Sequence, residues 1–240
     1  NNKMECYNFD NNKCDFYYKI SEIYQKKYKS IDCLENVHKL LLTDELSLDD
    51  KEYYNKMPIF GINDRKSVFV RDFYDNWDKD YSFLQLYLKF MINYIKPLFP
   101  KDDKILIQKT PNIRFHLPGH TNIGRRQSDP TDNIIGLHSD SEFGHPPEEY
   151  NIIIPITEMY DSNSLFYENG KNYTSLKLNR NEFAKIYLNK LKHYNCINKT
   201  NITRVSFDAR VIPYSQYKIT NTISATTNSK FELGDYYMLI

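Results

Sequence analysis

The sharpest chemical feature of the sequence is a histidine and an aspartate two positions apart, in Leu137-His138-Ser139-Asp140. Where such a segment is extended, residues i and i+2 point to the same side of the chain. The imidazole of His138 and the carboxylate of Asp140 can then bind one ion together. A second histidine would complete a two-histidine, one-carboxylate face, which leaves coordination positions open and suits iron(II) oxygen chemistry.

The third ligand of such a site must come from elsewhere in the chain. His193 lies 53 residues after Asp140, just before the most regular alternating segment of the sequence. A β-sandwich or barrel brings strands that are distant in sequence side by side, so we predict His193 as the third ligand. His145 is the alternative, although its place only five residues after Asp140 makes a facial arrangement awkward. His116 and His120 flank a Pro-Gly turn, and we expect structural roles for both.

An arginine and a serine follow His193 after eleven residues, as Arg204-Val-Ser206. Alternation along a strand places both side chains on one face. A guanidinium grips a carboxylate through two parallel charge-assisted hydrogen bonds, and a hydroxyl can add a third. The pair can therefore hold the far carboxylate of a keto-diacid whose other end chelates the metal. Arg210 shares this face as an alternative partner, and further candidates for binding substrate or co-substrate are Arg114, Asn151 and Asn163.

The order His138-x-Asp140, His193, Arg204-x-Ser206 resembles the iron(II)/2-oxoglutarate-dependent oxygenase superfamily. The likeness is closest to its streptomycin-biosynthesis-protein-like and phytanoyl-hydroxylase-like branch. It covers about residues 105–215, in which five blocks are similar to this branch and follow the same order: 109–119, 138–147, 151–157, 163–168 and 203–213.

This resemblance implies a non-haem dioxygenase that takes Fe(II), 2-oxoglutarate and O2, hydroxylates its substrate, and releases succinate and CO2. It implies that His138, Asp140 and His193 are the metal-binding and catalytic residues. It further implies that Arg204 and Ser206 bind 2-oxoglutarate, with Arg114 and Asn151 as additional contacts. Asp140 favours hydroxylation, because halogenases that resemble this family lack the carboxylate ligand.

Two other functions fit the same residues. One is a cupin-type metalloenzyme that does not use 2-oxoglutarate, and the other is a catalytically silent jelly-roll binding module that retains the motif. The substrate itself is not readable from the sequence. Small molecules, amino acids, lipids, sugars and protein side chains are all compatible with it, and the sequence says nothing of oligomeric state.

The elements that must position these residues change in character near residue 100. Apolar residues recur at helical spacing before that point, first at Ile20, Ile23, Tyr24 and Tyr28 and then from Cys33 to Leu41. The strongest predicted helix spans 80–95 and ends before Pro97. Its predicted apolar stripe consists of Tyr81, Leu84, Leu88, Met91, Ile92 and Ile95.

Short apolar or alternating segments with turns between them follow residue 104. Strands are predicted at 105–107, 112–117, 134–137, 151–156, 164–167 and 204–212, and residues 183–191 fit either a short helix or a strand. Many short strands favour an α+β protein whose core is a double-stranded β-helix, or jelly roll. We expect residues 101–240 to form this oxygenase core and residues 1–100 to form a helical layer packed on one sheet, as one structural unit.

Composition narrows the class of protein. The 240 residues carry a formal net charge of +1, which gives no electrostatic footprint for nucleic acid. No stretch of eighteen apolar residues is present, so no membrane span is expected. The four cysteines fit no zinc-binding spacing, and reduced thiols in a cytoplasmic protein are expected.

Overall fold

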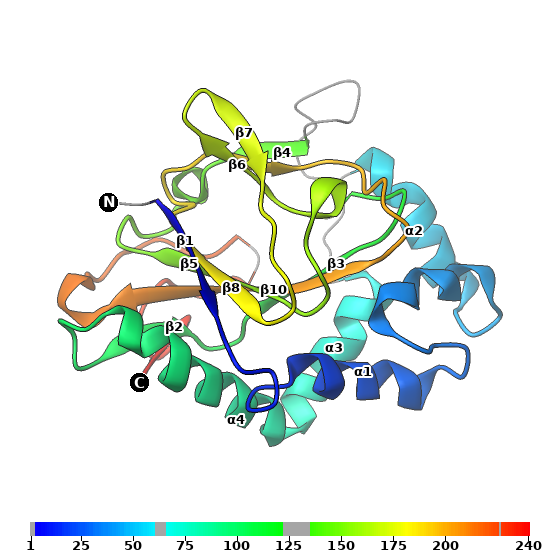
Figure 1. Ribbon diagram of the computed structural model, residues 1–240, viewed down its shortest axis with the longest axis horizontal. Coiled ribbons are helices and arrows are strands. Elements are labelled where there is room, and N and C mark those ends of the chain that lie inside the picture. Colours follow the sequence, from blue (N-terminus) through cyan, green and yellow to red (C-terminus); the bar gives the residue numbers. More distant parts are fainter. Residues whose placement is uncertain (1–2, 61–65, 122–134, 226) are drawn as a thin grey trace.

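The protein is built in three layers (Figure 1). The computed structural model describes residues 3–60, 66–121, 135–225 and 227–240; Ile134, in a predicted strand, lies outside them. Helices α1, α3 and α4 run beneath a large antiparallel sheet, and a small antiparallel sheet lies on the opposite side. The predicted mixture of helices and sheets is confirmed.

The helical layer comes from the first hundred residues. Asp15, Ser67 and Asp80 begin three of its helices, because each side chain accepts a backbone N–H of the first turn. The helices are α1 (Phe16–Lys27), the 3-10 helix η1 (Leu34–Leu42), α2 (Leu48–Phe60), α3 (Val68–Lys79) and α4 (Tyr81–Phe90), which continues as a π turn (Met91–Ile95) and a 3-10 turn (Lys96–Leu98).

Helix α4 confirms the predicted helix, and its predicted apolar stripe is right in part. Met91 and Ile95 are buried and Leu84 and Leu88 pack against the core, but Tyr81 and Ile92 are exposed. The buried residues Phe83, Tyr87 and Phe90 were not in the predicted stripe. The helix is apolar on several sides, so more than one stripe has helical spacing and local sequence does not decide which one faces the sheet. The π turn then shifts the register and brings both Met91 and Ile95 into the core.

The large sheet has the strand order β1-β8-β5-β10-β2-β11, and β3 pairs with β10 beside β2. Strand β10 is its longest element and pairs with β5 on one side and with β3 and β2 in succession on the other. The strands are β1 (Met4–Asn8), β2 (Ile105–Gln108), β3 (Asn112–His116), β5 (Tyr150–Pro155), β8 (Glu182–Ile186), β10 (Arg204–Pro213) and β11 (Tyr237–Leu239).

The small sheet has the order β4-β9-β6-β7 and is antiparallel throughout. Its strands are β4 (Ile135–His138), β6 (Phe166–Asn169), β7 (Asn172–Ser175) and β9 (His193–Asn195). The chain passes between the two sheets repeatedly from β3 to β10. As a result His138, at the end of β4, lies directly opposite His193, at the start of β9.

Strand β10 separates the core from the site. Val205, Phe207 and Ala209 are buried in the apolar cluster that the helices share with the sheet. The Phe207 ring lies 5.4 Å from that of Phe16 in α1 and 5.5 Å from that of Phe73 in α3. The alternate side chains, which face the small sheet, are Arg204, Ser206, Asp208 and Arg210.

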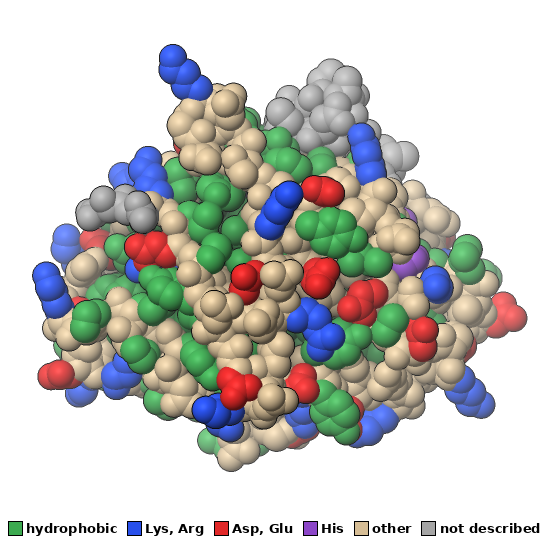
Figure 2. Space-filling view, in the orientation of Figure 1, with side chains coloured by type: hydrophobic (Ala, Val, Ile, Leu, Met, Phe, Trp, Pro, Cys, Tyr) green, Lys and Arg blue, Asp and Glu red, His purple; other side chains and the backbone are tan. Residues whose placement is uncertain are grey.

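On the face seen in Figure 2, neither positively nor negatively charged side chains form a large patch. Lys and Arg side chains are interspersed there with Asp and Glu, as the net charge of +1 suggests. No helix within the described ranges is both long enough and apolar enough to cross a bilayer. The four cysteines are free thiols.

Candidate metal site

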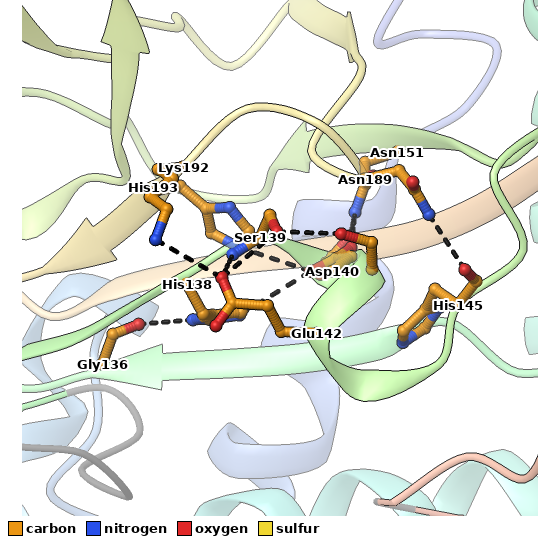
Figure 3. Close-up of polar contacts among 12 residues, drawn as sticks. Gly136, His138, Ser139, Asp140, Glu142, His145, Asn151, Asn189, Lys192 and His193 are labelled. Atoms are coloured by element: carbon orange, nitrogen blue, oxygen red, sulfur yellow. Dashed lines mark hydrogen bonds and ion pairs between the residues drawn. The ribbon is translucent and has the colours of Figure 1, made fainter.

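Two histidines and one aspartate converge between the sheets, each from a different local structure. His138 ends β4, Asp140 starts a 3-10 turn two residues later, and His193 begins β9. One ligand atom of each residue lies within 4.8 Å of the others. The Oδ1 atom of Asp140 is 3.4 Å from Nε2 of His193 and 3.7 Å from Nε2 of His138. Figure 3 shows the three side chains pointing toward one another.

Both imidazoles are oriented by the backbone. Nδ1 of His193 lies 3.0 Å from the carbonyl oxygen of Leu191, and Nδ1 of His138 makes a short hydrogen bond to the carbonyl oxygen of Gly136. A carbonyl can only accept, so each Nδ1 carries a proton and each Nε2 presents its lone pair. This arrangement fixes the tautomer that a metal-binding histidine needs.

The conformation of Gly136 allows the contact between its carbonyl oxygen and His138. Its φ of 69° lies in the left-handed region, which glycine adopts readily and most other residues do not. The pairing of β4 with β9 is also irregular between Ile135 and His138. We infer that this irregularity turns the Gly136 carbonyl toward the imidazole of His138.

Asp140 uses its two oxygens differently. Oδ1 faces the imidazoles, while Oδ2 accepts from Nη2 of Arg210 at 2.9 Å and from Nδ2 of Asn151 at 3.0 Å. Burial by itself would raise the pKa of Asp140, but the Arg210 guanidinium holds it well below its usual range. The carboxylate is therefore ionised, and its Oδ1 is available to a cation.

Arg204 is a buried cation with no acidic partner among the described residues. Its Nε donates to the carbonyl oxygen of Asn163 at 2.7 Å, and its Nη1 donates to Oγ of Ser206 at 2.8 Å. Burial, together with the nearby Arg114 guanidinium, lowers the pKa of Arg204 to about 9. A buried, uncompensated charge is costly, so this guanidinium is suited to an anionic ligand.

His116 lies behind Arg204 and is fully buried. Burial, reinforced by the positive charge of Arg204, lowers the pKa of His116 to about 3, so the imidazole is neutral at pH 7. Its Nε2 lies 2.9 Å from the carbonyl oxygen of His120, and its Nδ1 lies 3.5 Å from Nη2 of Arg204. This neutral ring packs against the guanidinium without adding charge, in line with the structural role expected for it.

A pocket of about 100 Å³ joins the metal ligands to Arg204. One water molecule needs roughly 10–15 Å³ of such volume, so a small organic ligand fits better than a single water. Besides the three metal ligands and Asn195, the pocket is lined by polar and by apolar side chains. The polar ones are Arg114, Arg204, Ser206, Asp208 and Arg210, and the apolar ones are Ile153, Met159, Leu165 and Leu188.

The structure places the remaining candidates in different positions. Arg114 lies opposite Ser206 in the sheet and lines the pocket. Asn151 does not line the pocket; it supports Asp140 from behind instead of facing a co-substrate. Arg210 shares the face of Arg204 as predicted, but it pairs with Asp140. His145 points away from the ligands, and its Nδ1 lies 2.5 Å from Oε2 of Glu149.

Asp208 is a pocket residue that sequence reasoning missed. Its Oδ2 lies 2.6 Å from Nη1 of Arg210, and its Oδ1 accepts from Asn151 at 3.3 Å. The signal was present, because Asp208 alternates in phase with Ser206 and Arg210 along one strand. Its link to Asn151 and Asp140 was not readable, because it depends on which strands become neighbours.

Comparison with known proteins supports the resemblance inferred from the motifs. No protein-family model matches the sequence. The chain is similar to the streptomycin biosynthesis protein StrG of Streptomyces griseus, with 27% identity over 177 residues that cover 72% of this chain and 77% of StrG. The predicted resemblance to the streptomycin-biosynthesis-protein-like branch is confirmed.

Among solved structures, the matches have low sequence identity and low TM-scores. A non-haem monooxygenase, ThoJ, in complex with nickel is 12% identical and has a TM-score of 0.41, with 86% of this chain and 71% of ThoJ covered. AviO1 from Streptomyces viridochromogenes Tue57 is 11% identical, with a TM-score of 0.40 and coverage of 83% and 87%. HygX from Streptomyces hygroscopicus, with nickel and 2-oxoglutarate bound, is 8% identical, with a TM-score of 0.35 and coverage of 80% and 97%.

Proposed function

We propose that this chain, which resembles the streptomycin-biosynthesis-protein-like oxygenases, is a non-haem Fe(II) and 2-oxoglutarate-dependent dioxygenase that hydroxylates a small-molecule or side-chain substrate. The observation that carries the proposal is the convergence of Nε2 of His138, Nε2 of His193 and Oδ1 of Asp140. Two imidazole nitrogens and one carboxylate oxygen are the ligands that non-haem iron(II) oxygenases present on one face.

We also infer that the two sheets form a double-stranded β-helix. Eight strands, β3 to β10, divide evenly between the sheets in the orders β3-β10-β5-β8 and β4-β9-β6-β7. Both sheets are antiparallel and face each other across the pocket, as in a jelly roll. Residues 1–100 then belong to the same structural unit, because β1 is a strand of the large sheet and the buried side chains of the helices share a core with that sheet.

The proposed site residues each have a distinct task. His138, His193 and Asp140 would hold iron(II) and leave the opposite coordination positions open to 2-oxoglutarate and O2. Iron(II) bound there would supply O2 activation, coupled to the conversion of 2-oxoglutarate into succinate and CO2. The protein contributes the fixed tautomers of both imidazoles and the ionised state of Asp140.

Arg204 would bind the distal carboxylate of 2-oxoglutarate, assisted by Ser206. Its guanidinium forms no ion pair with an acid among the described residues, and its closest side-chain acceptor is the hydroxyl of Ser206. The distal carboxylate of a keto-diacid would compensate the charge of Arg204, which favours such a ligand over a neutral one. The apolar side chains that line the pocket would pack against the methylene groups of 2-oxoglutarate and exclude water.

Anaerobic titration tests the proposal before the substrate is known. Iron(II) and 2-oxoglutarate added to the purified protein should give the visible charge-transfer absorption of a chelated 2-oxo acid. Admission of O2 should then release succinate. We expect His138→Ala, Asp140→Ala and His193→Ala to lose both signals, and Arg204→Ala to require at least tenfold more 2-oxoglutarate.

His38→Ala is the matched control, because His38 contacts Thr203 and lies outside the metal cluster. Metal binding without any response to 2-oxoglutarate would favour a cupin-type enzyme. Failure of the wild-type protein to bind iron(II), nickel(II) or cobalt(II) would leave the binding-module alternative and refute the proposal.

A further inference from the structure

The metal-facing carboxylate is held from behind by a closed polar network. Arg210 bridges Asp140 and Asp208 through its two terminal nitrogens, at 2.9 and 2.6 Å. Asn151 bridges the same two carboxylates from another strand, at 3.0 and 3.3 Å. We call Asn151, Asp208 and Arg210 the carboxylate clamp. Asp140, Asn151 and Arg210 are almost fully buried, and Asp208 is partly buried.

Every polar contact of the clamp with Asp140 goes to the same oxygen. Arg210 and Asn151 both donate to Oδ2, and Oδ1 is left facing the two imidazoles. A free carboxylate can bind a cation with one oxygen or with both. If both oxygens of Asp140 bound the metal, they would occupy a coordination position that a keto acid or O2 needs.

We propose that Arg210, supported by Asn151, is a positioning residue that restricts Asp140 to one metal-binding oxygen and fixes its direction before the metal binds. The proposal rests on the proposed metal site and goes beyond it by assigning a task to residues that hold a metal ligand and not the metal itself. It also assigns different roles to the two arginines of β10. Arg204 has no acid to bind, whereas both ends of Arg210 are occupied by carboxylates.

Sheet register makes this arrangement specific. Arg210 lies opposite Asn151 in the pairing of β10 with β5, and Asp208 lies two residues before Arg210 on the same face. Asp140 enters from the loop after β4, and its backbone N–H is held by the carbonyl oxygen of Leu188. The clamp therefore ties the ligand-bearing loop to the most extensively paired strand of the molecule.

Metal binding by the apo-protein tests the proposal without any need for turnover. Arg210→Gln removes the positive charge and the two-nitrogen guanidinium group that bridges Asp140 and Asp208. Asn151→Leu removes the amide that also donates to Asp140, at similar side-chain volume. Outer partners of metal ligands typically contribute 10–100-fold to metal affinity. We expect the dissociation constant for cobalt(II), measured by calorimetry, to rise by about 10–100-fold in Arg210→Gln and by about tenfold in Asn151→Leu.

The visible spectrum of the cobalt(II) protein provides a readout that general destabilisation does not move. We expect it to change in both variants, because a released Asp140 alters coordination number. Arg180→Gln is the matched control, since this arginine packs over the ring of Tyr17, away from the metal cluster. It should keep the wild-type affinity and spectrum.

The outcomes separate the two proposals. If wild-type protein binds no cobalt(II), or if His193→Ala binds it equally well, the proposed metal site itself is refuted. If wild-type binding depends on His193 but both clamp variants keep its affinity and spectrum, only the role of the clamp is refuted. Should Arg210→Gln fail to fold, Asn151→Leu decides the question alone by the same criteria.

Discussion

Arg204 is the residue whose surroundings restrict the ligand most strongly. It is buried, its pKa is lowered to about 9 by burial and by Arg114, and no acid of the described chain pairs with it. Most buried cations in proteins are paired, because an isolated one loses its hydration without compensation. The surroundings therefore favour an anion, and the metal ligands at the other end of the pocket favour one that also chelates.

Conservative substitution of Arg204 tests this assignment. Arg204→Lys keeps the charge but loses the fork that grips a carboxylate, so we expect a 10–100-fold higher KM for 2-oxoglutarate. The dissociation constant for cobalt(II) should stay within about twofold of wild type, because Arg204 does not touch the metal ligands. An unchanged KM would mean that the co-substrate carboxylate binds elsewhere.

His116 predicts a specific dependence of stability on pH. Its pKa falls from 6.5 to about 3 on folding, so the folded state favours the neutral imidazole. The resulting stabilisation is fully present above the unfolded pKa and is lost as the pH falls from about 6.5 toward 3. Between pH 7 and pH 5, this histidine should remove about 2 kcal/mol from the free energy of unfolding.

Urea denaturation at the two pH values measures this loss. His116→Asn lowers stability at pH 7 but should lose markedly less than wild type on going to pH 5. The same loss in both proteins would show that other groups control the acid response. His38, whose pKa burial also lowers, is the first of these to examine, with His38→Asn as the control variant.

At the scale of elements, strand β10 carries both stability and function on opposite faces. Phe207 packs between α1 and α3, whereas Ser206 beside it faces the pocket. Phe207→Ala should lower the free energy of unfolding by about 3–5 kcal/mol, because it removes a fully buried ring.

Ser206→Ala, in contrast, should lower the free energy of unfolding by about 1 kcal/mol or less. It should weaken 2-oxoglutarate binding several-fold, because it removes the hydroxyl that assists Arg204.

Denaturant titration and 2-oxoglutarate titration of the two variants check this division. The folded fraction of Phe207→Ala should bind cobalt(II) with wild-type affinity. A large stability loss in Ser206→Ala, together with unchanged co-substrate binding, would mean that the inner face of β10 serves packing and not the ligand.

Local patterns predicted the elements whose side chains alternate or repeat clearly. Strand β10, α1 and α4 are of this kind. Strands β1, β9 and β11 were missed, because they are three to five residues long and pair with strands that lie far away along the chain. Strand β7 was also missed, although it forms a hairpin with β6, the strand just before it. Strand β1 pairs with β8, nearly 180 residues away, and nothing in its own five residues announces that contact.

The same distinction applies to the site. His138, Asp140, His193 and Arg204 could be proposed because their order and spacing have a chemical meaning. The structure brings them to one pocket, and it places His145 on Glu149 instead. The carboxylate clamp was out of reach, since it depends on the register that sets Arg210 opposite Asn151.

At the scale of the whole molecule, helices and sheet share one apolar core. Rings from α1, α3 and α4 meet side chains of β3, β8 and β10 in a single buried cluster. Trp77, the sole tryptophan, lies within the helical layer against Phe83 and Tyr87. A layer that depends on the sheet for burial should not unfold independently.

Two probes test this cooperativity. The fluorescence of Trp77 reports the helical layer, and circular dichroism includes the signal of the sheets. In a urea titration, we expect both to give the same midpoint and slope. A tryptophan transition at clearly lower urea would show that residues 1–100 form a separately unfolding unit.

The most direct test of the central claim is a crystal structure of the protein with nickel(II) and N-oxalylglycine, a 2-oxoglutarate analogue. We predict one metal ion about 2.0–2.2 Å from Nε2 of His138, Nε2 of His193 and Oδ1 of Asp140, with the distal carboxylate of the analogue on Arg204. A metal bound elsewhere, or an analogue whose carboxylate leaves Arg204 without a ligand, would contradict the account.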